Sequence, residues 1–340
     1  MSDPHEQAAD APRVLVIKLS SLGDLFHVLP AVHRIKAGLG ARVDWATQRD
    51  YAELVRCFGV VDRVIAFPRR DTVRRFPSFL RELRRERYDH VIDFQGLLKS
   101  ALIGRLARSG DRLGPSFHRE GAHLFYTRLA GARDKNRHAV EENQELADAL
   151  GVPAGPVEYP LNFPEFKPTE PAPRVACVPC SRWASKNWPA SRFVETLRRL
   201  QAERGAAVYL LGGELDRYLC EGMAAQLTGP VFNMAGRLSL PELGGVLKAM
   251  DLVLANDTGP IHLAAALGIP VLAIFGSTDA VRTGPYGAGH QVVIAEGLAC
   301  RPCFRRACAQ ADPSACLAAI EPDTVAAHAL RMLTGCKTKF

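Results

Sequence analysis

The sequence predicts an α/β protein made of two consecutive domains, each with a parallel sheet covered by helices. Short apolar runs alternate with segments of helical spacing, which is typical of strand–helix–strand units. A Pro-rich stretch at 164–173 places four Pro in ten positions and is typical of a linker. The same alternation restarts after it. A length of 340 residues and a hydrophobic content of 47% suit two domains with sizeable cores.

We therefore expect a first domain over 13–163, a linker over 164–173 and a second domain over 174–340. Residues 1–12 are polar and acidic, so we expect a disordered tail there and not a signal peptide. No apolar run reaches the ~18 residues that a membrane-spanning helix needs. A cytoplasmic location is the resulting expectation.

The first domain begins with the apolar run RVLVIKL at 13–19, followed by a turn at 20–24 and a helix at 25–37. Three further strands are expected in this domain, at 42–47, 63–67 and 90–94. Parallel strands joined by helices bring their carboxyl ends, and any ligand, to one edge of the sheet.

The second domain repeats this pattern. Its expected strands lie at 174–178, 206–211, 231–234, 252–255, 271–275 and 291–295, and a last helix follows at 324–334. Two α/β domains of similar size are expected to face each other, so that their strand ends line a central cleft.

The stretch 252–267, LVLANDTGPIHLAAAL, predicts a buried strand, a tight loop and the start of a helix. Asn256 and Asp257 leave the strand and are suited to capping the helix, and Pro260 suits its first turn. The unpaired N–H groups of a helix start favour a phosphate or diphosphate. Asp257, Thr258, Gly259 and His262 would surround that ligand. The alternative is an ordinary strand-to-helix turn without a ligand.

Asp24 follows Gly23 in the first turn of the first domain. A carboxylate at that edge of the sheet is suited to take a proton from an attacking hydroxyl as a general base. The alternative is a helix-capping role, because Asp is favoured in a first helical turn.

Two loops of the second domain carry further candidates. In SRWASKNWP at 181–189, Lys186 and Arg182 are suited to neutralise phosphates and Ser181 to donate a hydrogen bond; the alternative is a solvated loop. In the LLGGE turn, Glu214 is suited to bind a ribose hydroxyl pair, or the motif is simply a turn. No GxGxxG follows a strand and no GxxxxGK[ST] occurs, which argues against a dinucleotide oxidoreductase or a P-loop enzyme.

The charge distribution indicates an anionic partner. The net charge is +7, and the stretch 69–89 carries eight Arg against four acids. Its arginines are expected in or beside a helix. That helix could contact an anionic membrane surface or a phosphorylated acceptor. The alternative is a solvated helix face without a partner. The members we single out are Arg74, Arg75, Arg81, Arg84, Arg85 and Arg87.

A cluster of four cysteines lies near the end of the chain, at Cys300, Cys303, Cys308 and Cys316. Four thiolates at this density are compatible with a structural zinc site. The spacings are not two matched CxxC pairs, so we expect metal-free thiols on an elaborated loop, either buried or redox-paired.

Taken together, several of these motifs resemble the ADP-heptose:lipopolysaccharide heptosyltransferases of glycosyltransferase family 9. The similarity runs from about residue 13 to residue 333. It is carried by VLVIKLSSLGDLFHVLPAV near the start, YDHVIDFQGLLKSALIGRLA at 88–107, HAVE at 138–141, SKNWP, LLGGE, and NDTGPIHLAAALGIPVLAIFGSTD at 256–279. The SSxGDxxHxLP, QGLLKSA and FYTR motifs are most like heptosyltransferase I, which adds the first heptose to the inner core, and the Cys-rich stretch is more like heptosyltransferase II.

The resemblance implies two Rossmann-like domains facing a central cleft, the B-type glycosyltransferase architecture. It implies an inverting transfer of heptose from ADP-heptose to Kdo-bearing lipid A, with no bound metal and no cofactor. The enzyme would contact the inner face of the cytoplasmic membrane transiently. A monomer without a nucleic-acid partner is expected.

The resemblance also assigns roles to individual residues. Asp24 is the general base, and Lys186 answers the charge of the diphosphate. The donor-binding residues are Ser181, Lys186, Glu214, Asp257, Thr258, Gly259 and His262, and the residues that match acceptor-side positions are Lys99, Arg119 and His138.

One position departs from the family pattern, because the family often follows HAVE with Arg and this chain has Glu142. A contact to an acceptor phosphate or carboxylate is then absent or supplied elsewhere. Two alternatives stay open: a related glycosyltransferase with another nucleotide sugar or a later core acceptor, and a nucleotide-sugar-binding protein without catalysis. The presence of both Asp24 and Lys186 argues against the second.

Overall fold

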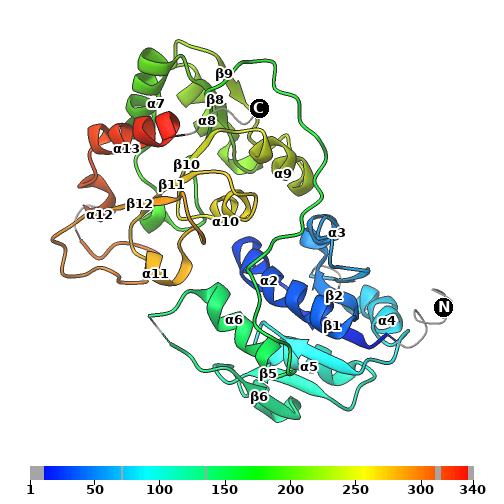
Figure 1. Cartoon of the computed structure of the whole chain (residues 1–340). Helices are drawn as coiled ribbons and strands as arrows, with labels where there is room; N and C mark the ends of the chain where they lie inside the picture. Colours follow the sequence, from blue (N-terminus) through cyan, green and yellow to red (C-terminus); the bar gives the residue numbers. More distant parts are fainter. Residues whose placement is uncertain (1–10, 70–71, 135, 311–314, 336–340) are drawn as a thin grey trace. The chain divides into compact units, whose positions relative to one another are not determined.

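The computed structural model describes residues 11–69, 72–134, 136–310 and 315–335. The chain divides into two compact units, Met1–Asn162 and Phe163–Phe340, and each is described by itself (Figure 1). The expected tail at 1–12 lies, up to residue 10, outside the described residues. No described helix combines the length and the apolar character needed to cross a bilayer.

The first unit is built on a parallel six-stranded sheet with the order β3-β2-β1-β4-β5-β6. Its strands are β1 (Arg13–Ile17), β2 (Arg42–Gln48), β3 (Arg63–Phe67), β4 (His90–Asp93), β5 (Arg112–Pro115) and β6 (Arg128–Ala130). Its helices are α2 (Leu22–Leu39), η1 (Arg49–Tyr51), α3 (Ala52–Arg56), α4 (Thr72–Leu83), α5 (Leu98–Leu106), η2 (Ala122–Phe125) and α6 (Ala139–Asp148).

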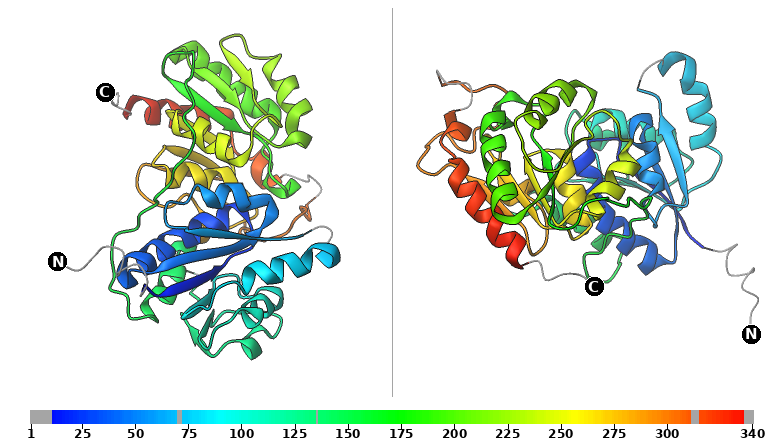
Figure 2. Two further views of the ribbon diagram at one scale, coloured as in Figure 1. Left: turned by 90° about the vertical axis from the view of Figure 1, so that its right-hand side faces the viewer. Right: turned by 90° about the horizontal axis from the view of Figure 1, so that it is seen from above.

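Helices cover both faces of this sheet (Figure 2). On one face, Phe79 of α4 and Ile103 of α5 join a buried cluster with alternate strand residues such as Leu15 and Ile65. On the other face, Phe26 of α2 packs against Phe58, which in turn meets the buried Trp45. Burial on both faces explains why β1 reads as a continuous apolar run.

The second unit carries a parallel sheet of the same kind, with the order β12-β11-β10-β7-β8-β9. Its strands are β7 (Arg174–Val178), β8 (Ala207–Leu210), β9 (Val231–Asn233), β10 (Leu252–Asn256), β11 (Val271–Phe275) and β12 (Gln291–Ile294). Its helices are η3 (Ala184–Lys186), α7 (Ala190–Arg204), η4 (Glu214–Asp216), α8 (Arg217–Ala224), α9 (Leu240–Lys248), α10 (Gly259–Ala266), α11 (Ala280–Thr283), α12 (Ala315–Ala318) and α13 (Pro322–Gly335).

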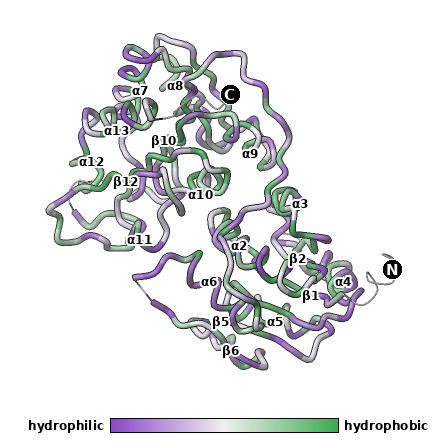
Figure 3. Tube along the Cα trace, in the orientation of Figure 1, coloured by the Kyte–Doolittle hydropathy of each residue, from purple (hydrophilic) through white to green (hydrophobic). Residues whose placement is uncertain are grey.

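The core of the second unit lies between the sheet and α7, α8 and α13. The last helix therefore belongs to this unit, where Val325 and Ala329 are fully buried. On the sheet's other side α10 is short and almost entirely apolar (Figure 3), in keeping with the burial of Ile261 and Leu263.

Both sheets have the strand order 3-2-1-4-5-6 when strands are counted from the start of each unit. This is the order of doubly wound nucleotide-binding folds. The connections change direction between β1 and β4 in the first unit and between β7 and β10 in the second. Ligands of such folds bind at the carboxyl ends of these two neighbouring strands. The predicted α/β class with two parallel sheets is confirmed.

The sequence analysis missed two strands, β5 and β6. Their sequences, RLGP and RLA, are three or four residues long and include Gly, Pro and exposed Arg128. Such short segments show no periodicity, and their strand pairing depends on neighbours distant in sequence: β5 pairs with the edge of β4, and β6 pairs with β5. The start of the chain also differs in detail, because β1 ends at Ile17 and α2 begins at Leu22.

The expected linker packs on the second unit. A Cβ on Gly244 of α9 would lie 2.4 Å from Phe163 Cδ1, and one on Gly245 would lie 2.2 Å from the carbonyl oxygen of Pro164. The Phe166 ring meets Tyr209 edge-on with centroids 6.1 Å apart. Small residues on α9 thus let this extended segment lie directly against the helix.

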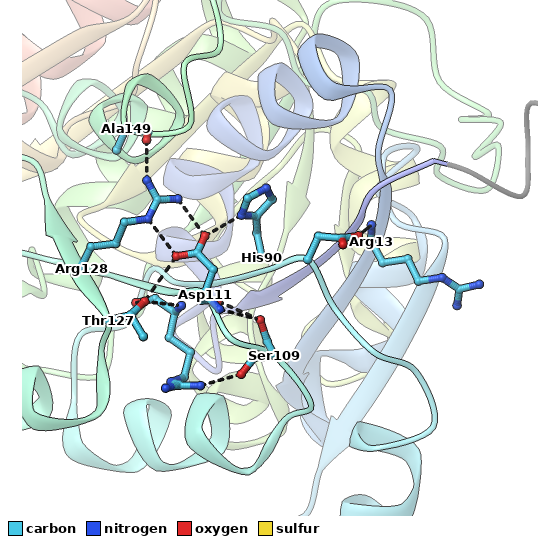
Figure 4. A network of polar contacts seen from close by, with 9 residues as sticks. Arg13, His90, Ser109, Asp111, Thr127, Arg128 and Ala149 are labelled. Carbon is cyan, nitrogen blue, oxygen red and sulfur yellow. Dashed lines mark hydrogen bonds and ion pairs between the residues drawn. The ribbon is translucent and has the colours of Figure 1, made fainter.

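A polar network joins the amino ends of β4, β5 and β6, at the edge of the sheet opposite the candidate site (Figure 4). The Asp111 carboxylate accepts hydrogen bonds from Arg128 Nε at 2.9 Å and Nη2 at 2.8 Å, and it lies 2.6 Å from His90 Nδ1. Arg128 also donates to the carbonyl oxygen of Ala149 just after α6. Asp111 and Arg128 together therefore link the amino ends of three strands to the end of α6.

Candidate active site

In the first unit, Asp24 lies in the first turn of α2, directly after the carboxyl end of β1. Its Oδ2 accepts hydrogen bonds of 2.9 Å from both the backbone N–H and the hydroxyl of Ser21. Its Oδ1 lies 3.7 Å from His27 Nδ1, and 43% of the side chain is exposed. One oxygen therefore caps the helix, as the alternative interpretation expected, and the other remains open to a ligand.

The charge of Asp24 is stabilised by its neighbours. Burial favours the neutral carboxyl, but the Lys18 ammonium, the His27 ring and the Ser21 N–H outweigh this and hold the pKa of Asp24 well below its usual range. Lys18 is 8% exposed, and its Nζ donates to the carbonyl oxygen of Phe94 at 3.2 Å. The carboxylate is thus ionised at neutral pH, which a proton acceptor requires.

The sequence analysis did not single out Lys18, because a lysine at the end of an apolar strand resembles a solvated strand end. In the structure His27 bridges Asp24 and His138, with the two imidazole centroids 5.4 Å apart. His138 itself is the N-cap residue of α6, and its Nδ1 accepts a hydrogen bond from Val140 N.

The other two acceptor-side candidates lie near the carboxyl end of β4. Lys99 Nζ lies 4.3 Å from the Phe67 ring centroid, and burial together with the nearby Arg69 lowers the pKa of Lys99. Arg119 is exposed, and its backbone N–H donates to the carbonyl oxygen of Gly96. Both cations therefore flank the loop that follows β4.

A buried carboxylate shapes that loop. Asp93, 1% exposed, accepts hydrogen bonds from Tyr126 OH at 2.6 Å and from Gln95 N at 2.8 Å. Gln95 Oε1 in turn accepts from Leu19 N and Ser20 N, which belong to the loop after β1. The two loops at the switch point of this sheet are thereby held together.

Glu142, the position that departs from the family pattern, is buried, and its carboxylate accepts a hydrogen bond from Asp134 N at 3.2 Å.

In the second unit, the central feature is an ion pair between Lys186 and Asp257. Lys186 Nζ lies 2.6 Å from Asp257 Oδ2, and the two side chains are only 18% and 6% exposed. Thr278 donates its hydroxyl to the same carboxylate oxygen. These residues come from the loops after β7, β10 and β11. The structure thus joins two of the predicted donor residues that lie far apart in the sequence.

Asn256 has a different role from the one predicted. It is the last residue of β10 and fully buried, with Oδ1 accepting from Trp188 N at 3.0 Å and Nδ2 donating to the Pro179 carbonyl at 2.6 Å. The amide clamps the loop of Lys186 onto the strand. Neither Asn256 nor Asp257 caps α10, because Thr258 occupies the cap position with an extended backbone.

Three predicted donor residues follow in the same chain segment. Thr258 precedes α10, Gly259 begins it, and His262 is 8% exposed in its second turn. Pro at the second helical position removes only its own N–H, one of the groups of the first turn that have no partner within the helix. The start of α10 thus follows Asp257 of the ion pair directly in the sequence, and it provides N–H groups for an anion.

Ser181 and Glu214 lie at neighbouring strand ends. The Ser181 hydroxyl donates to the Trp183 carbonyl at 3.1 Å, and its backbone N–H donates to Asn187 Oδ1 at 2.7 Å. Glu214 is exposed after β8 and lies against Gly236, where a Cβ would be 2.5 Å from Glu214 Oε2. Gly236 has φ 71°, and because it has no Cβ it leaves room for the Glu214 carboxylate.

The cysteine cluster forms no disulfide in the structure: Cys300, Cys303, Cys308 and Cys316 are all free thiols. Within the described parts of the chain, no group of three or more His, Cys, Asp or Glu side chains is arranged to hold a metal ion. Burial raises the pKa of Cys316, with a smaller contribution from the neighbouring Cys308 and Cys303. A raised pKa keeps this thiol protonated and weakly reactive.

Comparisons with known proteins show the family of the chain and proteins of similar fold. The model of glycosyltransferase family 9 (heptosyltransferase) matches residues 76–312. Lipopolysaccharide heptosyltransferase 1 of Pseudomonas aeruginosa is 34% identical over 317 residues, with 87% of each chain covered.

Two solved structures of the E. coli heptosyltransferase WaaC are also similar to the whole chain. The complex with ADP has a TM-score of 0.78 at 27% identity, and covers 94% of this chain and 99% of WaaC. The complex with ADP-2-deoxy-2-fluoro heptose has a TM-score of 0.76 at 28% identity, with the same coverage. The chain therefore belongs to glycosyltransferase family 9, the heptosyltransferases.

Proposed function

We propose that this enzyme transfers heptose from ADP-heptose to a Kdo-bearing lipid A acceptor, with inversion at the anomeric carbon and without a bound metal. The observation that carries the proposal is the Lys186–Asp257 pair beside the start of α10, at the switch point of the second sheet. Cationic and N–H groups at that place suit a nucleoside diphosphate. The similarity to WaaC, solved with ADP and with a fluorinated ADP-heptose, supports the adenine nucleotide and the heptose.

In this mechanism the acceptor hydroxyl attacks the anomeric carbon from the face opposite ADP. Asp24 Oδ1 takes the hydroxyl proton as the new C–O bond forms. A carboxylate with a low pKa is a weak base in the ground state, but the attacking oxygen becomes strongly acidic as it bonds to the sugar. The proton therefore moves late, when transfer to Asp24 is favourable.

The leaving diphosphate gains negative charge in the transition state. Lys186 and the N–H groups at the start of α10 would stabilise that charge more than they stabilise the bound donor, which lowers the barrier. Thr278 and Lys186 together hold Asp257, so its carboxylate does not oppose the diphosphate as an unpaired anion. We assign Ser181, Glu214, Thr258, Gly259 and His262 to the donor as well.

The acceptor would meet the first unit, where Lys99, Arg119 and His138 provide groups for phosphates and carboxylates. A lipid acceptor places the reaction at the inner face of the cytoplasmic membrane, which the enzyme would visit as a peripheral monomer. The Arg-rich surface of α4 supports contact with that anionic face.

The test is a transfer assay with purified protein, delipidated Kdo-bearing acceptor and a panel of ADP-, UDP- and GDP-sugars. We expect transfer only from ADP-heptose and full activity in EDTA. The NMR spectrum of the product should show an anomeric configuration opposite to that of the donor. Transfer from another nucleotide sugar would instead support the related-glycosyltransferase alternative. Loss of activity on chelation that Mg²⁺ or Mn²⁺ restores would contradict the metal-free mechanism.

A further inference from the structure

The Cys-rich segment that follows β12 folds back onto the donor loop of the second unit. Its Arg301 anchors it, because the guanidinium donates to three backbone carbonyls near the carboxyl ends of β11 and β12. The acceptors are Gly276 O at 2.6 Å, Ala295 O at 2.8 Å and Phe275 O at 3.2 Å. The segment is thus fixed at the edge of the sheet where the candidate site lies.

A second set of contacts joins this segment to the residue before Lys186. Ser185 is 3% exposed, and its hydroxyl donates to the Arg305 carbonyl at 2.6 Å and lies 3.0 Å from Ser277 Oγ. The Ser277 carbonyl accepts from Phe304 N at 2.8 Å. Three loops, after β7, after β11 and after β12, therefore meet at Ser185.

The result is that two cations share one aromatic ring. Lys186 Nζ lies 4.8 Å from the Trp183 ring centroid, and the Arg306 guanidinium carbon lies 5.4 Å from the same centroid. Lys186 is paired with Asp257 at 2.6 Å, whereas Arg306 is exposed and takes part in none of the ion pairs found among the described residues. Arg306 therefore adds a positive charge beside Trp183 that lies outside the Lys186–Asp257 pair.

We propose that Arg306 binds the donor diphosphate as a second cation of the site, brought there by the Cys-rich segment. This inference rests on the proposed function, because it takes the ligand to be a nucleoside diphosphate. A guanidinium can bind phosphate oxygens with two parallel hydrogen bonds, and Trp183 orients it for that contact. It also gives the Cys-rich segment a purpose in substrate binding that needs no metal.

The experiment compares Arg306→Gln with Arg305→Gln, a matched control. Arg305 is the exposed neighbour, and its contact with Ser185 uses only the backbone carbonyl. Binding of ADP and of adenosine is measured by tryptophan fluorescence. Trp183 is the reporter, because it is half-exposed at the site while Trp45 and Trp188 are buried. Thermal melting checks that both variants fold.

We expect Arg306→Gln to weaken ADP binding about 10-fold or more, the range for a charge-assisted phosphate contact. Adenosine binding should stay unchanged, because adenosine has no phosphate, and Arg305→Gln should bind both like the parental protein. Equal ADP affinity of the two variants would overturn the inference. A parental protein that binds no ADP would instead overturn the proposed function.

Discussion

At the scale of single residues, the two carboxylate oxygens of Asp24 have different surroundings. Oδ2 accepts both hydrogen bonds from Ser21 and stabilises the start of α2. Oδ1 faces the His27 ring, with His27 Nδ1 at 3.7 Å. The capping role and the proposed catalytic role therefore belong to different oxygens of one side chain, and they can be separated by mutation.

Asp24→Asn should fold like the parental protein and lose ~10²–10⁴-fold in turnover, the usual range for a general base. The amide oxygen keeps the cap, but the group no longer accepts a proton. Turnover and thermal melting are measured together. Ser21→Ala is the matched control, since it removes one cap hydrogen bond and leaves the carboxylate; it should cost ~1 kcal/mol of stability and little turnover. Parental turnover in Asp24→Asn would rule out the base assignment.

Lys186 and Asp257 form a buried ion pair, so removing one partner leaves the other buried without its counter-charge. Lys186→Ala should lower the transfer rate more than it weakens donor binding, because the charge on the diphosphate grows as the bond breaks. It should also lower stability by ~3 kcal/mol through the unpaired Asp257. Rates, ADP affinity and melting temperature are measured for the variant.

The double variant Lys186→Ala/Asp257→Asn separates these two effects. It should recover most of the lost stability and part of the ADP affinity, because no unpaired carboxylate then faces the diphosphate. It should not recover the transfer rate, since the cation is still missing. A double variant as unstable as Lys186→Ala alone would show that the pair does not stabilise the fold.

At the scale of secondary structure, apolar and cationic residues alternate along α4 (Figure 3). Phe79 and Leu83 are buried against the sheet, while Val73 is 93% exposed. The exposed cations of the helix and of the loop after it are Arg74, Arg75, Arg81, Arg84, Arg85 and Arg87. The predicted placement of the arginines in or beside a helix is thus confirmed, and this face suits an anionic lipid surface.

Replacing Arg74, Arg75, Arg84 and Arg85 by Gln should weaken binding to vesicles that contain anionic lipid. Each basic residue near such a surface contributes about 1 kcal/mol, screened by salt. Vesicle sedimentation at low and high salt measures the effect. A matched control replaces four exposed cations of the second unit, Arg198, Arg204, Lys248 and Arg331. Equal vesicle binding by both variants at low salt would leave α4 as a solvated helix.

The network around Asp111 makes a prediction about acid stability. The hydrogen bonds from Arg128 outweigh partial burial and, with His90, lower the pKa of Asp111 from 3.8 to about 2. A lowered folded-state pKa contributes stability that is present above the unfolded value and is lost as the pH falls through the folded value. The contribution is therefore complete above pH ~4 and disappears by pH ~2.

Asp111→Asn should accordingly lower stability by up to ~2 kcal/mol at neutral pH. The difference from the parental protein should shrink between pH ~4 and ~2, because the parental carboxyl becomes protonated there. Thermal melting as a function of pH measures both curves. A difference that is constant over this range would mean that the network stabilises the protein by packing and not through its charge.

At the scale of the whole molecule, one strand order is used twice for two tasks. The order places Asp24 and the β4 loop at the switch point of the first sheet, and Lys186 and Asp257 at that of the second. We assign the acceptor chemistry to the first unit and the donor to the second. This division predicts where a nucleotide alone should act.

ADP without acceptor should slow amide hydrogen exchange in the second unit, at the loops 179–188, 256–263 and 301–306. Residues 18–27 of the first unit should exchange at the rate of the free protein, because we assign this region to the acceptor and not to ADP. Adenosine should protect fewer of these amides, since phosphate contacts are missing. Protection confined to the first unit would contradict the assignment of the donor.

Much of this organisation was predictable because local patterns agree with the fold. Buried parallel strands such as β1 and β10 are apolar on both faces, so they are readable from sequence alone. Asp24, Lys186 and Asp257 lie in the connections that follow such strands, and in a parallel sheet the carboxyl ends of the strands share one edge. The class of fold and the candidate chemistry therefore follow from the sequence by itself.

Only the tertiary structure decided which side chains meet. Lys186 and Asp257 lie 71 positions apart, and Arg306 reaches Trp183 from a further segment, because three loops converge on the buried Ser185. Strands β5 and β6 likewise form by pairing, β5 with β4 and β6 with β5. Local periodicity records burial along one segment, whereas such contacts depend on the packing of distant segments, which no single stretch of sequence encodes.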